Sequence, residues 1–208
     1  MSFYGDRVFP RLMNLLMNTK HTREVRARVC ASLSGEVVEI GFGTGLNLPH
    51  LPSTVTCVRA VDPLERGRDL ASARIAASPV SVEFVGLDGQ SLPLGDDSVD
   101  AALSTWTLCS IPDPVAAVRE LKRVLRPGGT LHFVEHGCSP EVRVLKWQRR
   151  LNPVQRRLAC GCNLDRDIPS ILEAGGMHVV STSYYMKGNP KPLGWTFEGV
   201  ASATALQL

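Results

Sequence analysis

Residues 39–45 (EIGFGTG) form a glycine-rich stretch that constrains the fold more than any other part of the sequence. They close a short β-branched run at residues 36–40, which predicts a strand that ends in a glycine-rich turn. This combination is typical of the first strand-to-helix connection of an open α/β sheet, where ligands bind beyond the carboxyl ends of the strands. Glycines at such a turn let the backbone approach a ligand closely.

The rest of the chain alternates between strand and helix patterns, which is typical of βαβ units and a parallel sheet. The patterns predict strands at residues 36–40, 54–61, 80–86, 99–104 and 130–135, and two late strands near 179–185 and 195–201. They predict helices at residues 46–51, interrupted by Pro49, and at 64–77, 114–125, 142–158 and 168–174. Apolar residues at helical spacing predict one or two further helices within residues 9–33.

A length of 208 residues suits one α/β domain with a full hydrophobic core. We therefore predict a single doubly wound, Rossmann-like domain over residues 1–208. Residues 1–34 are expected to form a helical cover, and residues 137–165 a lid-like insertion.

Composition and charge exclude several classes of function. The net charge of +3 is close to balance, so we expect no nucleic-acid partner. The sequence has no run of 18 or more apolar residues, no secretory signal pattern and no hydrophobic N-terminal anchor, so a cytoplasmic location is expected. Six scattered cysteines fit a reducing compartment. Without a second cysteine pair or a histidine at metal-binding spacing, Cys160 and Cys162 are interpreted as loop cysteines, and no metal site is predicted.

Two classes of nucleotide cofactor compete for the glycine-rich turn. A dinucleotide loop needs Gly-x-Gly-x-x-Gly, but Leu46 or Leu48 stands where its third glycine would be. The acid-x-Gly-x-Gly-x-Gly pattern that is present is typical of enzymes that use S-adenosylmethionine (SAM). SAM has no pyrophosphate, and its ammonium and sulfonium groups favour a carboxylate at the strand end. The predicted cofactor-binding residues of this turn are Glu39, Gly41, Gly43 and Gly45.

Polar side chains at the ends of the next strands favour the same cofactor. Asp62 closes the second strand, where an acid can bind both ribose hydroxyls. Asp88 follows the third strand, where a carboxylate can accept a hydrogen bond from the adenine amino group, and Thr105 follows the fourth. Each acid also has a structural interpretation, Asp62 as a helix cap or turn residue and Asp88 as an Asx-turn residue. Three acids at consecutive strand ends favour cofactor binding.

These residues, together with residues 92–93 (LP), 98–100 (SVD) and 125–129 (LRPGG), resemble the class I SAM-dependent methyltransferases. Within that class, the chain is similar to a branch that includes the animal thiol methyltransferases of the methyltransferase-like group. The residues that carry this similarity are 107–110 (TLCS), 133–136 (FVEH) and 161–164 (GCNL). The resemblance covers roughly residues 35–176, and it implies a mostly parallel sheet of seven strands whose last strand is antiparallel.

The methyl acceptor is expected near the ends of the fourth and fifth strands, in a site that holds acceptor and methyl group together away from water. The candidates to bind it are Trp106, Cys109 and His136. Trp106 and Cys109 would line the pocket or else pack in the core. His136 is the candidate general base, because histidine titrates near neutral pH, and its alternative is a structural hydrogen bond at a strand end.

The sequence therefore predicts an enzyme that transfers a methyl group from SAM to a small, fairly apolar acceptor. The resemblance favours a thiol, and a phenol, a quinone or a phospholipid amine is the alternative. An NAD-dependent oxidoreductase and a non-catalytic SAM-binding protein are the alternatives from other classes.

The basic residues 142–158 are predicted to form an amphipathic lid helix, broken near Pro153. Weak peripheral contact of this helix with an anionic membrane, or recruitment of an acidic substrate, is its alternative role.

Overall fold

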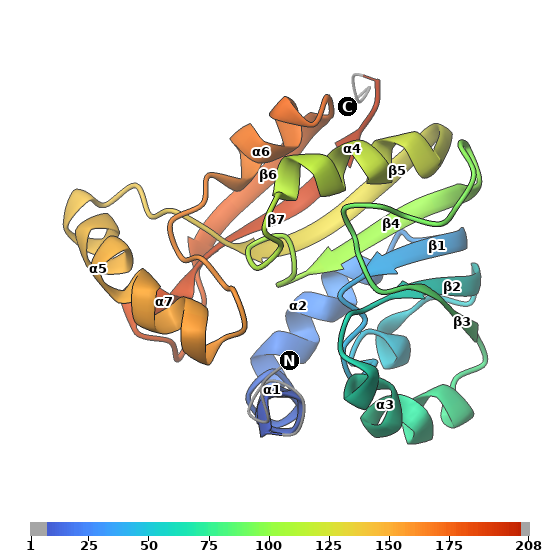
Figure 1. The fold of residues 1–208 in the computed structure, drawn as a ribbon, viewed down its shortest axis with the longest axis horizontal. Coiled ribbons are helices and arrows are strands. Elements are labelled where there is room, and N and C mark those ends of the chain that lie inside the picture. Colours follow the sequence, from blue (N-terminus) through green and yellow to red (C-terminus); the bar gives the residue numbers. More distant parts are fainter. Residues whose placement is uncertain (1–7, 205–208) are drawn as a thin grey trace.

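The computed structural model describes residues 8–204 and contains a seven-stranded sheet with helices on both faces (Figure 1). The strands are β1 (Gly35–Ile40), β2 (Val55–Val61), β3 (Ser81–Gly86), β4 (Val99–Thr105), β5 (Leu125–His136), β6 (His178–Tyr185) and β7 (Trp195–Ser202). Their order across the sheet is β3-β2-β1-β4-β5-β7-β6. β7 runs antiparallel to both of its neighbours, and the other pairs are parallel. The predicted doubly wound sheet with an antiparallel last strand is confirmed.

Helices cover the two faces of the sheet, and each face has its own hydrophobic core. α4 (Pro114–Val124) and α6 (Ile168–Ala174) pack on one face, around the fully buried Phe133. α2 (Lys20–Cys30) and α3 (Glu65–Ala77) pack on the other face, with Val25 and Ala71 in the core. α1 (Phe9–Leu16), α5 (Val142–Leu158) and α7 (Lys191–Gly194) lie beyond the carboxyl ends of the central strands (Figure 1). Three helices and the sheet edge thus surround the place where the site is expected.

The connection from β1 to β2 differs from the sequence prediction. A helix over residues 46–51 was expected, but this segment contains only a 3-10 turn at Leu48–His50. Pro49 lacks a backbone N–H, so it cannot contribute to a longer helix. The side chain of Asn47 is turned inward, where it donates a hydrogen bond to Glu39. The helix prediction is therefore wrong at this position, because a buried polar contact and a proline outweigh the apolar pattern.

The break predicted in the basic helix is also wrong. Residues 142–158 form one continuous helix, α5, with Pro153 in its interior. Asn152 anchors the helix beside the proline, because its Oδ1 accepts from the Leu164 N–H at 2.8 Å and its amide donates to Asp165. No helix within residues 8–204 is long and apolar enough to cross a bilayer.

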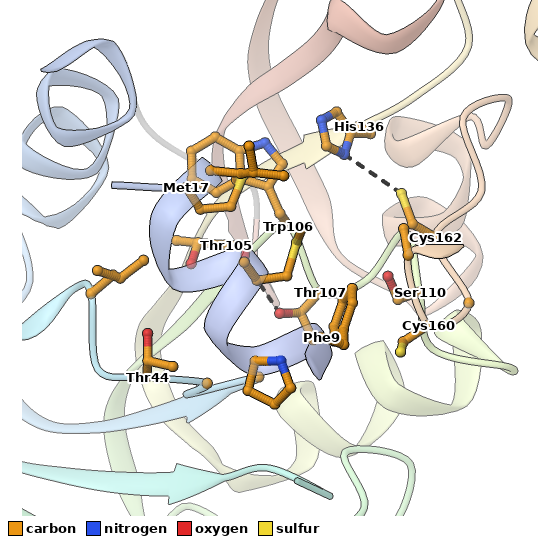
Figure 2. A pocket seen from close by; sticks show the side chains of 18 of the residues that line it. Phe9, Met17, Thr44, Thr105, Trp106, Thr107, Ser110, His136, Cys160 and Cys162 are labelled. Carbon is orange, nitrogen blue, oxygen red and sulfur yellow. Dashed lines mark hydrogen bonds between the residues drawn. The ribbon is translucent and has the colours of Figure 1, made fainter. Parts of the chain in front are cut away.

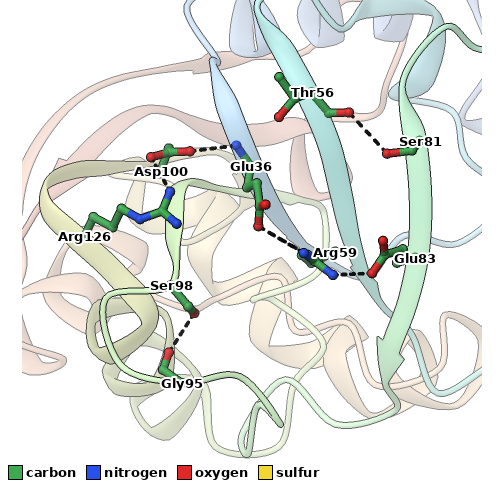
Figure 3. Close-up of polar contacts among 9 residues, drawn as sticks. All are labelled: Glu36, Thr56, Arg59, Ser81, Glu83, Gly95, Ser98, Asp100 and Arg126. Atoms are coloured by element: carbon green, nitrogen blue, oxygen red, sulfur yellow. Dashed lines mark hydrogen bonds and ion pairs between the residues drawn. The ribbon is translucent and has the colours of Figure 1, made fainter.

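Ion pairs connect the strands on the side of the sheet shown in Figure 3. Arg59 of β2 contacts Glu36 of β1 at 3.2 Å and also pairs with Glu83 of β3. Arg126 pairs with Asp100, which also accepts a hydrogen bond from the Glu36 N–H at 2.8 Å. Pairs at exposed and partly exposed positions of this kind contribute little to stability. Their effect is therefore mainly to favour the observed strand register.

A buried histidine joins α2 to the sheet. In the His132 ring, Nδ1 lies 3.2 Å from the Val29 carbonyl oxygen and Nε2 lies 3.0 Å from Thr130 Oγ1. Burial lowers the pKa of His132 below its ordinary value. Between the two pKa values the unfolded chain binds this proton more tightly than the folded chain, so stability rises with pH there. The stabilising contribution is present above about pH 6.5 and is lost as the pH falls below it.

We expect His132→Gln to reduce the loss of stability that the protein shows on acidification. A single group of this kind changes the free energy of unfolding by at most about 1.4 kcal/mol per pH unit. Urea unfolding at pH 7 and pH 5.5 measures the difference between the two proteins. His178→Gln, at an exposed position of β6, should keep the wild-type dependence. A dependence unchanged by His132→Gln would contradict the assignment.

Candidate active site

A cavity of about 1150 Å³ lies at the carboxyl ends of β1, β2, β4 and β5 (Figure 2). Its walls come from the turns that follow these strands, from α1 and α2, and from the segments around α5 and α7. An ordinary small-molecule site has a volume of roughly 300–1,000 Å³. The cavity therefore has room for a cofactor and a second small ligand at the same time.

The glycine-rich turn forms one part of the wall. Gly41 and Gly43 line the cavity, with φ angles of +73° and +56°, and Gly45 lies behind them. A Cβ atom on Gly41 would lie 1.9 Å from Thr107 Oγ1, so the turns after β1 and β4 pack directly on each other. A Cβ atom on Gly67 of α3 would lie 2.6 Å from the Gly43 carbonyl oxygen. The contacts of Thr107 and Gly67, which the sequence analysis missed, hold the turn against its neighbours.

Asp62 lies at the cavity wall with its carboxylate oriented by the backbone. One oxygen accepts from the Gly43 N–H and the other from the Leu64 N–H, each at 2.7 Å. Burial raises the pKa of Asp62, and these two hydrogen bonds oppose that rise. Asp62 therefore has the structural role in a turn that the sequence allowed as its alternative. A carboxylate has about four acceptor positions, so it can also accept from a ligand hydroxyl at the wall.

Asp88 also lines the cavity, but it is exposed. Its Oδ1 accepts from the backbone N–H of Gln90 at 2.8 Å and from the Gln90 side-chain amide at 3.0 Å. This is the Asx-turn contact that the sequence allowed as the alternative. Contact between Asp88 and an adenine group stays a prediction.

Glu39 lies one layer behind the cavity wall, in a buried polar network. It accepts a hydrogen bond from Asn47 Nδ2 at 2.7 Å, and the Asn47 oxygen accepts from Arg26 at 2.6 Å. Arg26 and Asn47 also donate to Thr105 Oγ1, at 2.9 Å and 3.0 Å. Burial raises the pKa of Glu39 to about 8. Of this group, Arg26 and Thr105 line the cavity and Glu39 does not.

Arg26 is a candidate site residue that the sequence analysis missed. Burial lowers the pKa of its guanidinium to about 10, and its charge lies 4.9 Å from the centre of the Trp106 ring. Its Nε has no hydrogen-bond partner among the described residues. The sequence feature that could have identified Arg26 is its position beside Val25 and near Val29, on the apolar face of α2. A solvated arginine is not expected on such a face.

The residues of this half of the cavity fit SAM. Asp62 offers an oriented carboxylate for a ribose diol, and the unpartnered Nε of Arg26 suits a carboxylate. The Oε2 of Glu39 is likewise buried without a partner in the described part of the chain. A nearby ammonium group would favour the charged form of this carboxyl and lower its pKa.

Trp106 and His136, the candidates to bind an acceptor, both line the cavity, and their acceptor role stays a prediction. Their ring centres lie 6.4 Å apart, and Figure 2 shows both side chains at the cavity. Trp106 has a φ angle of +53°, a left-handed conformation that is uncommon for a bulky residue. Such strained positions cluster at functional sites. The Trp106 Nε1 is buried without a partner among residues 8–204.

Cys109 and Cys162 meet beside His136. The two sulfurs lie 3.6 Å apart, and Cys162 Sγ lies 3.6 Å from His136 Nδ1. Cys162 lines the cavity, whereas Cys109 is fully buried behind the wall. Cys160 and Cys162 both lie in the loop between α5 and α6, but Cys160 is exposed whereas Cys162 is buried and packs with Cys109 and Leu164.

The contacts among Cys109, His136 and Cys162 shift the pKa values of all three side chains. The hydrogen bond shared with Cys109 is the main cause that lowers the pKa of Cys162 well below its ordinary value, and His136 adds to this effect. The same contact, with burial, raises the pKa of Cys109. Burial alone would lower the pKa of His136, but its contact with Cys162 outweighs burial, so this pKa is raised. These contacts therefore favour ionisation of Cys162 over ionisation of Cys109.

Glu135 fixes the turn that carries Cys109. Its buried carboxylate accepts from the backbone N–H groups of Thr107, Leu108 and Cys109, at distances of 3.0, 3.0 and 3.1 Å. Burial raises the pKa of Glu135, and its hydrogen bonds oppose that rise. A carboxylate with several backbone donors is a rigid support. The position of Cys109 is therefore set by β5 as well as by β4.

The segment predicted as a lid contributes Gln155 and residues 159–162 to the wall. No other α5 residue lines the cavity: Val144, Gln148 and Asn152 are buried against other segments, and Val142, Trp147, Val154 and Leu158 are exposed. Its basic and apolar surface is not part of the cavity. Peripheral membrane contact of this helix stays a prediction.

Comparisons with known proteins show the family to which the chain belongs. A family model described as a methyltransferase domain matches residues 38–133. The chain is 32% identical over 204 residues to human (Homo sapiens) thiol S-methyltransferase TMT1B, covering 90% of this chain and 80% of that protein. It is 31% identical over 162 residues to the rat (Rattus norvegicus) protein of the same name, covering 76% of this chain and 65% of the relative, just under two thirds of its length.

The fold is also similar to that of a solved SAM-dependent methyltransferase from Aquifex aeolicus. The TM-score is 0.64 at 19% identity, and the match covers 92% of this chain and 97% of that one. At this identity the likeness concerns the fold alone.

Proposed function

Since the chain belongs to the SAM-dependent methyltransferases and is related to the thiol S-methyltransferases, we propose that it methylates the sulfur of a small apolar thiol. SAM supplies an electrophilic methyl group on a sulfonium. Asp62 would hold the ribose hydroxyls and Arg26 the carboxylate, while the buried Glu39 would offset the charge of the ammonium group. These residues orient the donor and leave the half of the cavity near Trp106 and His136 for the acceptor.

The observation that carries the choice of acceptor is the sulfur- and imidazole-containing end of an otherwise largely apolar cavity. Met17, Trp106 and Leu193 are among the apolar residues that line the cavity. An ordinary thiol has a pKa of about 8.5, so roughly 3% of it is ionised at pH 7. A phenol, with a pKa of about 10, is ionised roughly 30-fold less. A thiol therefore needs the least help to become a nucleophile in a site of this kind.

A matched acceptor series tests this proposal. Phenylmethanethiol, phenylmethanol and phenylmethanamine share one skeleton and differ in the acceptor atom. With isotope-labelled SAM, we expect mass spectrometry to find the methyl sulfide and neither the ether nor the methylamine. SAM should also raise the melting temperature, whereas NAD should not. Methylation of the amine or alcohol with the thiol untouched would contradict the proposal, as would an absence of product from all three.

His136→Ala tests the acceptor end of the cavity separately from the donor end. At pH 7 we expect a loss of turnover of about 10- to 30-fold, since an unassisted thiol is only a few per cent ionised. SAM affinity should stay within about twofold, because His136 takes no part in the hydrogen bonds that hold Asp62 and Arg26. The defect should shrink as the pH approaches 9, where the thiol ionises unaided. Unchanged turnover at saturating thiol would remove His136 from the reaction.

A further inference from the structure

Three side chains from distant parts of the chain converge at the acceptor end of the cavity. Cys109 follows β4, His136 ends β5, and Cys162 lies in the segment after α5. Their ligand-type atoms, two sulfurs and one ring nitrogen, all lie within 4.8 Å of one another. Figure 2 shows the His136 ring and the Cys162 sulfur facing each other.

Two of the three ligand-atom distances fit a tetrahedral zinc ion, and the third, between the Cys109 sulfur and the His136 ring nitrogen, is within 4.8 Å. Zinc binds cysteine sulfur at about 2.3 Å and histidine nitrogen at about 2.0–2.1 Å, which places neighbouring ligand atoms about 3.4–3.8 Å apart. Cys162 Sγ lies 3.6 Å from both Cys109 Sγ and His136 Nδ1. Thiolate and imidazole are also the ligands that favour Zn²⁺ over the harder divalent ions.

The backbone around this cluster is held in place without a metal. The carbonyl oxygen of Cys109 accepts from the Asn163 N–H at 2.8 Å, which joins the two cysteine-bearing segments. The Asn163 side-chain amide donates to the same oxygen at 3.2 Å. With Glu135 on the Cys109 N–H, the cluster has a preorganised scaffold. Preorganised ligands lower the entropic cost of binding an ion.

We propose that Cys109, His136 and Cys162 bind one Zn²⁺ ion and leave its fourth coordination position open to the cavity, where the acceptor sulfur binds as a thiolate. The role of the fourth position rests on the thiol acceptor proposed above. Three protein ligands with one open position are typical of catalytic zinc sites, including sites with two cysteines and one histidine. His136 and Cys162 line the cavity and Cys109 lies behind it, so the open position faces the cavity.

Zinc would activate the acceptor by lowering the pKa of its thiol. A thiol that coordinates zinc is deprotonated, and the proton passes to solvent. The acceptor sulfur then forms its bond to the methyl carbon as the bond from that carbon to the sulfonium breaks. The electron pair of the broken bond stays on the departing sulfur, which becomes the thioether of S-adenosylhomocysteine. The methylated acceptor is a neutral thioether and a weaker ligand than the thiolate, so its release is favoured.

Cobalt substitution tests the site without an activity assay. The full chain, reduced and freed of metal by a chelator, is titrated with Co²⁺. We expect one Co²⁺ per chain, with thiolate-to-cobalt charge-transfer absorption and the intense d–d bands of tetrahedral coordination, and displacement of both by Zn²⁺. Cys109→Ser and Cys162→Ser should each lose these bands. Cys138→Ser, which removes a cysteine near His136 but outside the cavity wall, should keep them.

Wild-type protein that gives no such bands would overturn the metal site, and so would equal spectra for Cys162→Ser and Cys138→Ser. SAM binding by calorimetry shows whether each variant is folded.

Phenylmethanethiol should shift the charge-transfer bands of the cobalt protein, whereas phenylmethanol should not. Charge-transfer bands that do not change when phenylmethanethiol is added would overturn the proposed role of the fourth coordination position. If no cobalt binds, methylation of phenylmethanethiol in the matched acceptor series can still be observed, and the proposed function stands. If cobalt binds but no thiol is methylated, the proposed function is overturned instead.

Discussion

Asp62→Ala is expected to weaken SAM binding by about 100- to 1,000-fold. A hydrogen bond to a charged group is worth about 1.5–3 kcal/mol, so the loss of two ribose contacts, each near the lower end of this range, amounts to roughly 3–4 kcal/mol. The carboxylate also holds the Gly43 and Leu64 N–H groups at 2.7 Å, and its loss leaves this turn without its anchor. Isothermal titration calorimetry of the wild type and the variant measures the change in affinity.

Two matched variants show whether the effect belongs to Asp62. Asp62→Asn keeps one acceptor oxygen and the side-chain shape, so we expect a smaller loss of about tenfold. Asp88→Ala removes an exposed acid at the same cavity, and its loss should be less than tenfold. Circular dichroism melting confirms that each variant is folded. Wild-type affinity in Asp62→Ala would contradict the assignment of Asp62 to the donor.

Gly41→Ala is expected to lower the free energy of unfolding by about 2–5 kcal/mol. A left-handed backbone costs a residue with a Cβ atom about 1–2 kcal/mol, and Gly41 has a φ angle of +73°. The new Cβ would also lie 1.9 Å from Thr107 Oγ1, and overpacking of this kind typically costs about 1–3 kcal/mol. Urea unfolding followed by circular dichroism measures the sum.

Gly43→Ala is the matched control for Gly41→Ala, because it has the conformational cost without the clash. Its φ angle is +56°, but the nearest atom to a Cβ there is the Gly41 carbonyl oxygen at 3.8 Å. We expect a loss of only about 1–2 kcal/mol. Thr107→Gly in the Gly41→Ala background should recover part of the stability by making room for the methyl group. Equal destabilisation by the two alanine variants would contradict the packing of the β1 turn against Thr107.

Most of the fold was predictable because its signals are local in the sequence. The strands and α6 follow from short apolar runs and turn residues, and α5 occupies residues 142–158, as its amphipathic pattern predicts. The errors came from contacts that local patterns do not contain. Asn47 is turned toward Glu39 instead of continuing a helix, and Asn152 supports α5 beside Pro153. Both are single buried amides whose partners lie on other segments.

The candidate site likewise has one part that local sequence patterns predict and one part that they do not. Gly41, Gly43 and Asp62 lie at the cavity wall, as the spacing of one strand and one turn predicts. The cluster of Cys109, His136 and Cys162 could not be predicted in this way, because its cysteines are 53 residues apart in sequence and match no metal-binding spacing. They meet because β4 and β5 are neighbours in the sheet and because the segment after α5 returns to their carboxyl ends.

Methylation of 4-mercaptophenol tests the central claim most directly, since this acceptor carries a thiol and a phenol on one ring. The protein is incubated with SAM that carries a labelled methyl group, and the product is identified by NMR from the chemical shift of the new methyl. We predict the S-methyl product, formed by the wild type and lost in Asp62→Ala at limiting SAM. An O-methyl product from the wild type would contradict the account.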